Sequence, residues 1–370
     1  MFKNPHISFS PNHQKTDLIL MVLTVLLTLF GLVMIYEASN VSAYGSFNDK
    51  FHFVKDQSVW AFIGIVNLII LSRVHYKHYF SLAVPFLTFT LITLVFVLIP
   101  GIGLKALGAR RWIEIGNFSF QPSELAKLSL ILYLSAWLES KEKGRFLQFM
   151  ALFALIVGLV VLQPDLGTAI ILSSIFLVVY FISNAPFWHF LILVPASLIS
   201  VIILALISPY RYQRLLTFLN PSLDPMGSSY HIRQILISLG SGGFFGLGLG
   251  ASRQKYQYLP EATTDSIFAI IGEEFGFLGT IIFIFIYIYL IYRIFKIVKN
   301  APDKFSFLLS AGIMSLIGFQ VIINLGAMVA LFPLTGIPLP FISYGGTNLI
   351  MTMSAIGILL NIARYGKARK

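Results

Sequence analysis

The chain has 370 residues, of which 57% are hydrophobic and only 11% are charged, and it contains no cysteine. So little charge excludes a soluble globular protein, and the lack of cysteine excludes disulfides and thiolate metal sites. The net charge of +11 does not indicate nucleic acid, because the basic residues lie in short groups between apolar runs. We therefore expect an all-α integral membrane protein with one polytopic membrane domain over residues 1–370.

Ten apolar runs are long enough to cross about 30 Å of hydrocarbon, so both termini should lie on one side. The runs are at 18–36, 58–72, 80–100, 122–138, 147–162, 168–184, 187–208, 266–292, 305–332 and 341–363. The first run lacks a small-residue cleavage site and is expected to remain as a signal-anchor helix. With the N-terminus inside, most Lys and Arg fall in inward-facing segments, which predicts that both termini are cytoplasmic.

The first polar interruption covers residues 105–127. Pro122 predicts the start of a helix, and Glu124 suits the positive end of its dipole. Glu124 and Lys127 are three residues apart and share a helical face, so they can form a buried ion pair that either braces the bundle or contacts a substrate. Arg110 and Arg111 face outward, where they fit either an anionic, phosphate-bearing lipid or ordinary headgroups.

The second interruption, residues 163–168, joins two spans. Asp165 can cap the helix that follows, and a direct catalytic role is the alternative.

The third interruption is a large extracytoplasmic loop, residues 209–265, between the seventh and eighth helices. Its glycines at 240–250 lie among Phe and Leu with no preceding strand, which argues against a dinucleotide site and favours a re-entrant or interfacial helix packed closely on its neighbours. The loop ends at Asp265, at the mouth of a helix expected to carry Gly272 and Gly276 on the same face. Partial desolvation would raise the proton affinity of this carboxylate toward that of a general base, whereas the structural alternative is again a helix cap.

The fourth interruption, residues 333–347, contains three prolines and three glycines and cannot form a continuous lipid-facing helix. We expect it to line the same outward cavity as Asp265 and Arg110.

Four motifs, in order along nearly the whole chain, resemble the SEDS (shape, elongation, division and sporulation) family, which includes FtsW and RodA. The motifs are Ala109-Arg-Arg-Trp with Gln121-Pro-Ser-Glu-Leu-Ala-Lys127, Gln163-Pro-Asp-Leu-Gly-Thr, Tyr258-Leu-Pro-Glu-Ala with Thr264-Asp265, and Phe341-Ile-Ser-Tyr-Gly-Gly.

This resemblance implies a SEDS-type bundle of about ten helices in the bacterial cytoplasmic (inner) membrane and a peptidoglycan glycosyltransferase that polymerises lipid II onto an undecaprenyl-pyrophosphate-linked glycan. It makes Asp265 the essential catalytic residue, acting as the general base, Glu124 and Lys127 a functional ion pair, and Asp165 an important acid. The other substrate-binding candidates, chosen for charge or motif, are Arg110, Arg111, Arg214, Arg253 and Ser343.

The resemblance also implies partners: a class B penicillin-binding protein, which supplies the transpeptidase, and other divisome or elongasome membrane proteins. It leaves open a divalent cation, Mg²⁺ or Mn²⁺, for which the sequence shows no ligand set. Residues 258–262 and 271–274 resemble the division branch more than the elongation branch. Thr263 and Ser266 depart from the His and Phe that the family commonly has beside the acid.

Two other functions fit the same composition. A lipid II flippase would also have many spans and broken helices, although the chain shows no internal repeat and its polar residues gather near one membrane face. A non-catalytic scaffold of the divisome would not need Asp265.

Overall fold

Each of the ten predicted apolar runs overlaps one helix of the computed structural model. The structure describes residues 16–106, 109–116, 118–140, 144, 146–220, 227, 229–256 and 258–366. The ten helices are α1 (Leu18–Phe47), α2 (His52–Arg73), α3 (Lys77–Phe96), α4 (Pro122–Trp137), α5 (Phe146–Leu162), α6 (Leu166–Ile182), α7 (Phe187–Ile207), α10 (Ile267–Lys299), α11 (Lys304–Met328) and α12 (Gly346–Arg364). Within the described residues, α1, α2, α3, α7, α10, α11 and α12 are long and apolar enough to cross a membrane, and α4, α5 and α6 are shorter. The protein is a multi-pass membrane protein.

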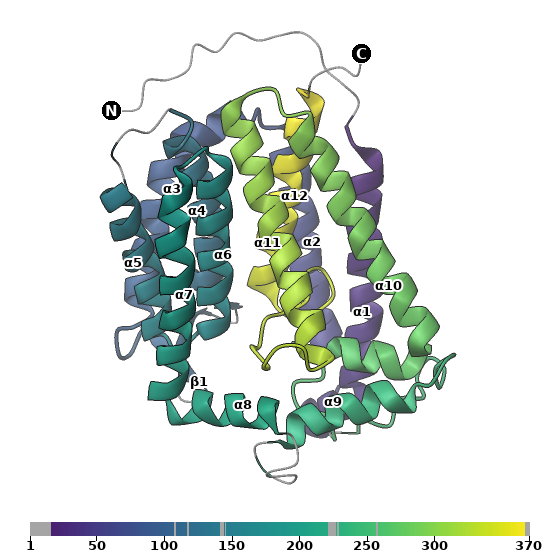
Figure 1. Cartoon of the computed structure of the whole chain (residues 1–370). Helices are drawn as coiled ribbons and strands as arrows, with labels where there is room; N and C mark the ends of the chain where they lie inside the picture. Colours follow the sequence, from purple (N-terminus) through teal and green to yellow (C-terminus); the bar gives the residue numbers. More distant parts are fainter. Residues whose placement is uncertain are drawn as a thin grey trace.

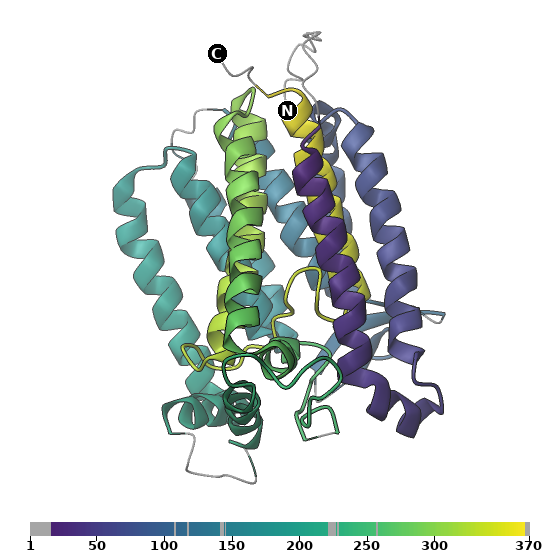
Figure 2. The same ribbon diagram turned by 90° about the vertical axis from the view of Figure 1, so that its right-hand side faces the viewer.

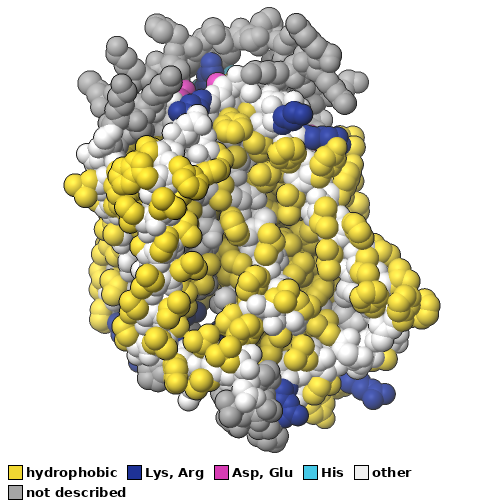
Figure 3. Space-filling view, viewed as in Figure 1, with side chains coloured by type: hydrophobic (Ala, Val, Ile, Leu, Met, Phe, Trp, Pro, Cys, Tyr) yellow, Lys and Arg dark blue, Asp and Glu magenta, His cyan; other side chains and the backbone are white. Residues whose placement is uncertain are grey.

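The long helices run side by side, and two short helices, α8 (Pro209–Leu219) and α9 (Tyr230–Ser241), lie across one end of the bundle (Figures 1 and 2). The first turn of α1 and the last turn of α12 lie at the other end, where Arg364 Nε donates to Thr16 Oγ1 over 2.8 Å. These two ends of the described chain are on one side, as the even number of runs predicts. Between the two ends, hydrophobic side chains cover the face seen in Figure 3, while Lys and Arg gather near both ends.

A three-stranded antiparallel sheet lies at the same end as α8 and was not predicted. Its strands are β1 (Gly103–Ala106), β2 (Ala109–Ile115) and β3 (Phe118–Phe120), in the order β1-β2-β3. Ile113 and Ile115 alternate with Glu114, which is typical of a strand, but the alternation is too short to separate from a polar loop. Strand β3 leads directly into α4, the helix that carries Glu124.

Helix α4 forms the centre of the bundle, because nearly all of its side chains are buried. It begins at Pro122, as predicted, since proline is tolerated at the first helical position. Polar side chains fix its neighbours: Asn361 of α12 accepts from the Tyr76 backbone over 2.8 Å and donates to the Ser72 carbonyl over 3.0 Å. These bonds join α12 to the connection between α2 and α3.

The glycines after α9 allow backbone to pack on backbone, as predicted. A Cβ on Gly242 would lie 2.1 Å from the Gly272 carbonyl oxygen, and a Cβ on Gly246 would lie 2.1 Å from that of Glu274. The prediction that Gly276 shares a continuous helical face with Gly272 is wrong, because Gly276 has φ 67° and kinks α10. Only a residue without Cβ adopts this conformation cheaply, so Gly276 breaks the helix instead of lining one face of it.

Replacing Gly246 by alanine is expected to destabilise the protein more than replacing Gly248. Both residues have positive φ, +84° and +97°, so alanine strains both backbones by about 1–2 kcal/mol. No atom lies within 4 Å of a Cβ on Gly248, whereas a Cβ on Gly246 meets backbone, which adds about 1–3 kcal/mol. Denaturant unfolding in micelles measures the difference, and equal losses for the two variants would contradict the close packing.

Residues 333–345 form a non-helical segment, as predicted, and residues 339–343 of it are buried in protein. Tyr287 donates its hydroxyl to the Pro340 carbonyl over 2.6 Å, and Asn324 Nδ2 donates to that of Ile337 over 2.8 Å. Gln57 of α2 accepts from the Gly345 backbone over 3.1 Å. Side chains of three helices therefore satisfy backbone groups that hydrocarbon could not.

Candidate active site

The buried ion pair predicted on α4 is present. Lys127 Nζ lies 2.7 Å from Glu124 Oε1, and both residues are buried, at 3% and 4% exposure. The pair spans one helical turn, so α4 holds its geometry. Burial removes water from both charges, so each charge is stabilised mainly by the other.

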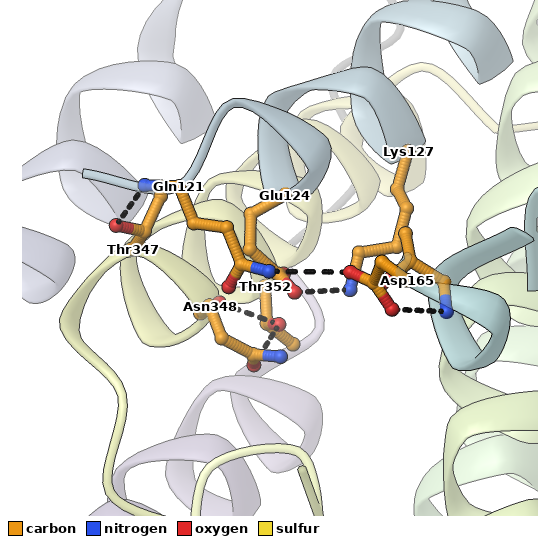
Figure 4. A network of polar contacts seen from close by, with 8 residues as sticks. Gln121, Glu124, Lys127, Asp165, Thr347, Asn348 and Thr352 are labelled. Carbon is orange, nitrogen blue, oxygen red and sulfur yellow. Dashed lines mark hydrogen bonds and ion pairs between the residues drawn. The ribbon is translucent and has the colours of Figure 1, made fainter. Parts of the chain in front are cut away.

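Asp165 lies beside this pair and caps α6, as predicted. Its Oδ1 accepts from the Thr168 backbone over 3.1 Å, and its Oδ2 accepts from the Thr168 hydroxyl over 2.8 Å. Gln121 Nε2 also donates to Asp165 Oδ2, over 3.4 Å. Figure 4 shows Gln121, Glu124, Lys127 and Asp165 close together, and we call these four residues the Glu124 cluster. Capping α6 is not the only role of Asp165, because its carboxylate also accepts from Gln121 and so joins α6 to the start of α4.

The sheet brings one of the two predicted arginines to this region. Arg111 Nε donates to the Gln163 carbonyl over 3.1 Å, and its Nη2 donates to the carbonyl of Pro164. Neighbouring side chains of a strand point to opposite faces, so Arg110 does not share this contact. Arg110 pairs in register with Lys105 of β1. Arg111 therefore braces the connection that ends in Asp165.

Asp265 lies in the loop directly before α10 and is 7% exposed. It is not the helix cap, because the N-cap of α10 is Ser266. Asn324 Nδ2 donates to the Asp265 backbone carbonyl over 2.9 Å, and the Thr264 hydroxyl donates to Asp265 Oδ1 over 3.2 Å. These bonds hold the residue at its backbone carbonyl and at one carboxylate oxygen.

The surroundings of Asp265 favour its protonated form. Burial, and then the negative charge of Glu261, raise the pKa of Asp265 to about 6, while Arg214 and the Thr264 hydrogen bond oppose this rise. A carboxylate with a pKa near 6 is still ionised at neutral pH and binds a proton more strongly than an ordinary aspartate. Asp265 is thus suited to general-base chemistry.

A cavity of about 320 Å³ lies beside this loop, between α8, α9 and the segment after α11. Its lining residues are Gln213, Arg214, Thr217, Phe218, His231, Ile232, Phe332 and Leu334. Arg214 Nη1 donates to the Leu334 carbonyl over 2.8 Å, which holds the guanidinium in the wall. The lining offers hydrogen-bond donors and one fixed positive charge, and no carboxylate. It suits a polyhydroxyl ligand with an anionic group.

A thin segment separates Asp265 from the Glu124 cluster. A Cβ on Gly336 would lie 3.8 Å from Asp265 Oδ2, and a Cβ on Gly167 would lie 2.7 Å from the Thr335 carbonyl oxygen. Gly167 is two residues after Asp165. Residues 335–337 therefore touch the start of α6 and also approach Asp265.

Two predicted residues do not face the cavity. The Ser343 hydroxyl accepts from the Leu339 backbone over 2.8 Å, so this side chain shapes the turn. Arg253 has an exposed side chain, and its backbone donates to Glu273 Oε1 over 3.0 Å. Neither is among the residues that line the cavity. Arg110 and Asp265 are not among the lining residues either, so the prediction that they line one cavity finds no support here.

Three polar residues near the site were not predicted from the sequence: Asn324, Gln57 and His231. Asn324 and Gln57 are buried polar residues in apolar helices, and such residues indicate a structural or functional contact. His231 lies in a polar loop, where nothing in the sequence distinguishes it from a surface histidine. In the described part of the chain, no three His, Asp or Glu side chains come together as a cation site would need, so we derive no step through Mg²⁺ or Mn²⁺.

Comparison with known proteins identifies relatives over nearly the whole chain. A family model described as "Cell cycle protein", covering FtsW, RodA and SpoVE, matches residues 17–368. The stage V sporulation protein E of Bacillus subtilis is 41% identical over 95% of this chain and 98% of its own. The probable peptidoglycan glycosyltransferase FtsW of Trichlorobacter lovleyi is 40% identical over 94% of this chain and 93% of its own.

Solved structures of related chains have the same fold. A chain of a peptidoglycan synthase complex, from a study of how polymerization and crosslinking are coordinated, superposes with a TM-score of 0.78, at 29% identity over 95% of this chain and 98% of its own. The rod shape determining protein RodA of Thermus thermophilus gives 0.71, at 30% identity over 96% and 100%. The four motifs, the fold and these relatives agree, and the chain belongs to the FtsW, RodA and SpoVE family, the SEDS membrane proteins.

Proposed function

We propose that this protein is a peptidoglycan glycosyltransferase that polymerises lipid II at the outer face of the bacterial cytoplasmic membrane, with both termini in the cytoplasm. Relatives at 37–40% identity over most of the chain carry the name peptidoglycan glycosyltransferase. The observation that carries the proposal is the buried Asp265, whose neighbour Ser266 contacts His231 of the cavity lining and whose carboxylate feels the charge of Arg214 in that lining. The FtsW names favour a role in division.

The proposed step is a displacement at the anomeric carbon of the growing, lipid-linked chain. Asp265 accepts the proton of the sugar 4-hydroxyl of incoming lipid II, and the hydroxyl oxygen forms the new bond to the anomeric carbon with inversion. The bond from that carbon to the diphosphate oxygen breaks, and undecaprenyl pyrophosphate leaves with the electron pair. Arg214 lies where it can stabilise the negative charge of the leaving group. Asp265 then returns its proton to water.

The Glu124 cluster is proposed to bind substrate on the other side of residues 335–337. Arg111 and Asp165 hold the connection before α6, so this wall is built from α4, α6 and β2. A class B penicillin-binding protein, and other membrane proteins of the division or elongation machinery, are the proposed partners. The solved synthase complex supports a partner of the first kind.

Polymerisation in detergent tests the function. The purified chain, together with a class B penicillin-binding protein, is given labelled lipid II, and glycan strands are separated by gel electrophoresis. Detergent has no two sides, so a flippase or a scaffold makes no strands, whereas a polymerase does. The partner alone is the control, and strands made by the partner alone, or none made by the pair, would reject the proposal.

The pH dependence of polymerisation should follow the ionisation of Asp265. Because the pKa of Asp265 is raised to about 6, kcat/KM is expected to be steady at pH 7–8 and to fall toward lower pH with a midpoint near pH 6. The negative charge of Glu261 contributes to this rise, so Glu261→Gln should move the midpoint to lower pH. Glu114→Gln, a neutralised exposed acid on β2, is the matched control and should leave it in place. A midpoint unchanged by Glu261→Gln would contradict the assignment.

A further inference from the structure

His231 contacts the residue that directly follows Asp265. It lies in the first turn of α9 and lines the cavity, and its Nε2 lies 2.7 Å from Ser266 Oγ. The imidazole thus connects the cavity wall on α9 with the start of α10.

The hydroxyl of Ser266 does not cap α10, although Ser266 is at the N-cap position. Ser266 is the N-cap of α10, and serine at this position usually accepts from the second or third helical N–H. Its side chain makes no such bond, because it faces His231 instead. The Ser266 side chain therefore links α9 to the loop of Asp265 and does not cap α10.

The imidazole is uncharged at neutral pH. Burial, and then the positive charge of Arg214 on α8, lower the pKa of His231 to about 4, and a hydrogen bond to the Pro260 backbone opposes this shift only in part. In the neutral ring one nitrogen accepts, so Nε2 can accept the Ser266 hydroxyl proton. The contact is therefore a neutral hydrogen bond that persists over the pH range in which Asp265 ionises.

The loop of Asp265 is held at three points. Tyr344 donates its backbone N–H to the Thr263 carbonyl over 2.8 Å, Asn324 holds the Asp265 carbonyl, and His231 holds Ser266. The first two contacts act on the backbone before and at Asp265, and the third acts after it. Together they fix the backbone on both sides of the carboxylate, as a base in a constrained geometry requires.

We propose that His231 is a positioning residue for the reaction at Asp265, which it serves by holding Ser266 and so fixing the orientation of the adjacent carboxylate beside the cavity. This inference rests on the proposed glycosyltransferase function. His231 acts on Asp265 indirectly, because its hydrogen bond is with Ser266. Loss of the His231 side chain should slow the chemical step, because a small misplacement of a base slows the reaction more than it weakens substrate binding.

Polymerisation kinetics of four variants test the proposal. His231→Leu removes the hydrogen bond and keeps an apolar filling, and we expect kcat to fall about tenfold or more with KM within about twofold. Ser266→Ala should give the same loss, and the double variant His231→Leu with Ser266→Ala should lose no more than either alone. His231→Gln keeps an uncharged acceptor and should restore most of kcat.

A second histidine supplies the matched control. His189, in the first turn of α7 at the opposite end of the bundle, lies 2.6 Å from the Tyr180 hydroxyl through Nδ1. His189→Leu removes the same type of bond, and its kcat should stay at the wild-type value even if its unfolding temperature falls. A near-normal kcat in His231→Leu, additive losses in the double variant, or no recovery in His231→Gln would each overturn the positioning role. If wild-type protein makes no strands while the assay works with a known polymerase, the proposed function fails instead.

Discussion

Asp265→Asn is expected to reduce lipid II polymerisation by at least about 100-fold, because asparagine cannot accept the sugar proton and a positioned base contributes about 10²–10⁴ in rate. The change keeps the shape of the side chain, and its oxygen can still accept from the Thr264 hydroxyl. The measurement is single-turnover polymerisation by the purified pair at pH 7.5. Retention of more than a tenth of the wild-type rate would remove Asp265 from the role of base.

The same variant should be more stable than wild type, which separates lost chemistry from lost folding. A folded-state pKa of about 6, above the ordinary 3.8, means that the ionised carboxylate weakens folding at pH above 6. The shift corresponds to about 3 kcal/mol at most. Asparagine removes this cost, so Asp265→Asn should unfold at a higher temperature than wild type at pH 8. The difference should shrink as the pH falls below 6 and vanish only below about pH 3, where the carboxyl of Asp265 is protonated in both the folded and the unfolded state. A variant that is less stable at pH 8 would contradict the raised pKa.

Breaking the Glu124–Lys127 pair should have the largest effect on folding. Glu124→Gln leaves Lys127 buried with an uncompensated charge, and Lys127→Met does the same to Glu124. Each single change is expected to lower the free energy of unfolding by about 3–5 kcal/mol. Denaturant unfolding in micelles measures it. A loss below about 1 kcal/mol in both would show that the charges reach water.

The double variant Glu124→Gln with Lys127→Met decides between a brace and a substrate contact. Removing both charges should recover most of the stability, because no unpaired charge is left in the interior. If the pair only braces the bundle, polymerisation recovers together with stability. If it binds substrate, as we propose, the double variant folds but polymerises poorly. Lys55→Met, which breaks the exposed Asp49–Lys55 pair, is the control and should change stability by less than about 1 kcal/mol.

The helices and their local signals could be predicted from the sequence because they depend on nearby residues. Apolar runs between charged groups marked the ten long helices, Pro122 marked the start of α4, and Asp165 was recognised as a cap. The one-turn spacing of Glu124 and Lys127 predicted their pair, since the helix itself brings them together. The position of Asp265 at the end of the loop singled it out, but left a general base and a helix cap as equal alternatives, and the resemblance then favoured the catalytic role.

The remaining features depend on contacts between distant segments. Gly276 looks like a residue of a packed helical face, and only the approach of the Phe244–Gly246 backbone explains why the chain kinks there. His231 and Ser266 are 35 residues apart, and Asn324 reaches Asp265 from 59 residues away. No local pattern encodes such pairs. Arg110 and Arg111 were equivalent in sequence, and the unpredicted sheet gives them different faces.

The segment 335–337 makes its two sides energetically dependent on each other. It touches Gly167 on one side and approaches Asp265 on the other, and its backbone is fixed at Ile337 by Asn324, the residue that also holds the Asp265 carbonyl. A ligand that pushes on this segment from the Glu124 cluster must change the free energy of placing Asp265. By linkage, whatever binds beside Asp265 changes the affinity of the other side by the same factor. Ligands beside Asp265 and beside the Glu124 cluster can thus respond to each other without any movement of the long helices.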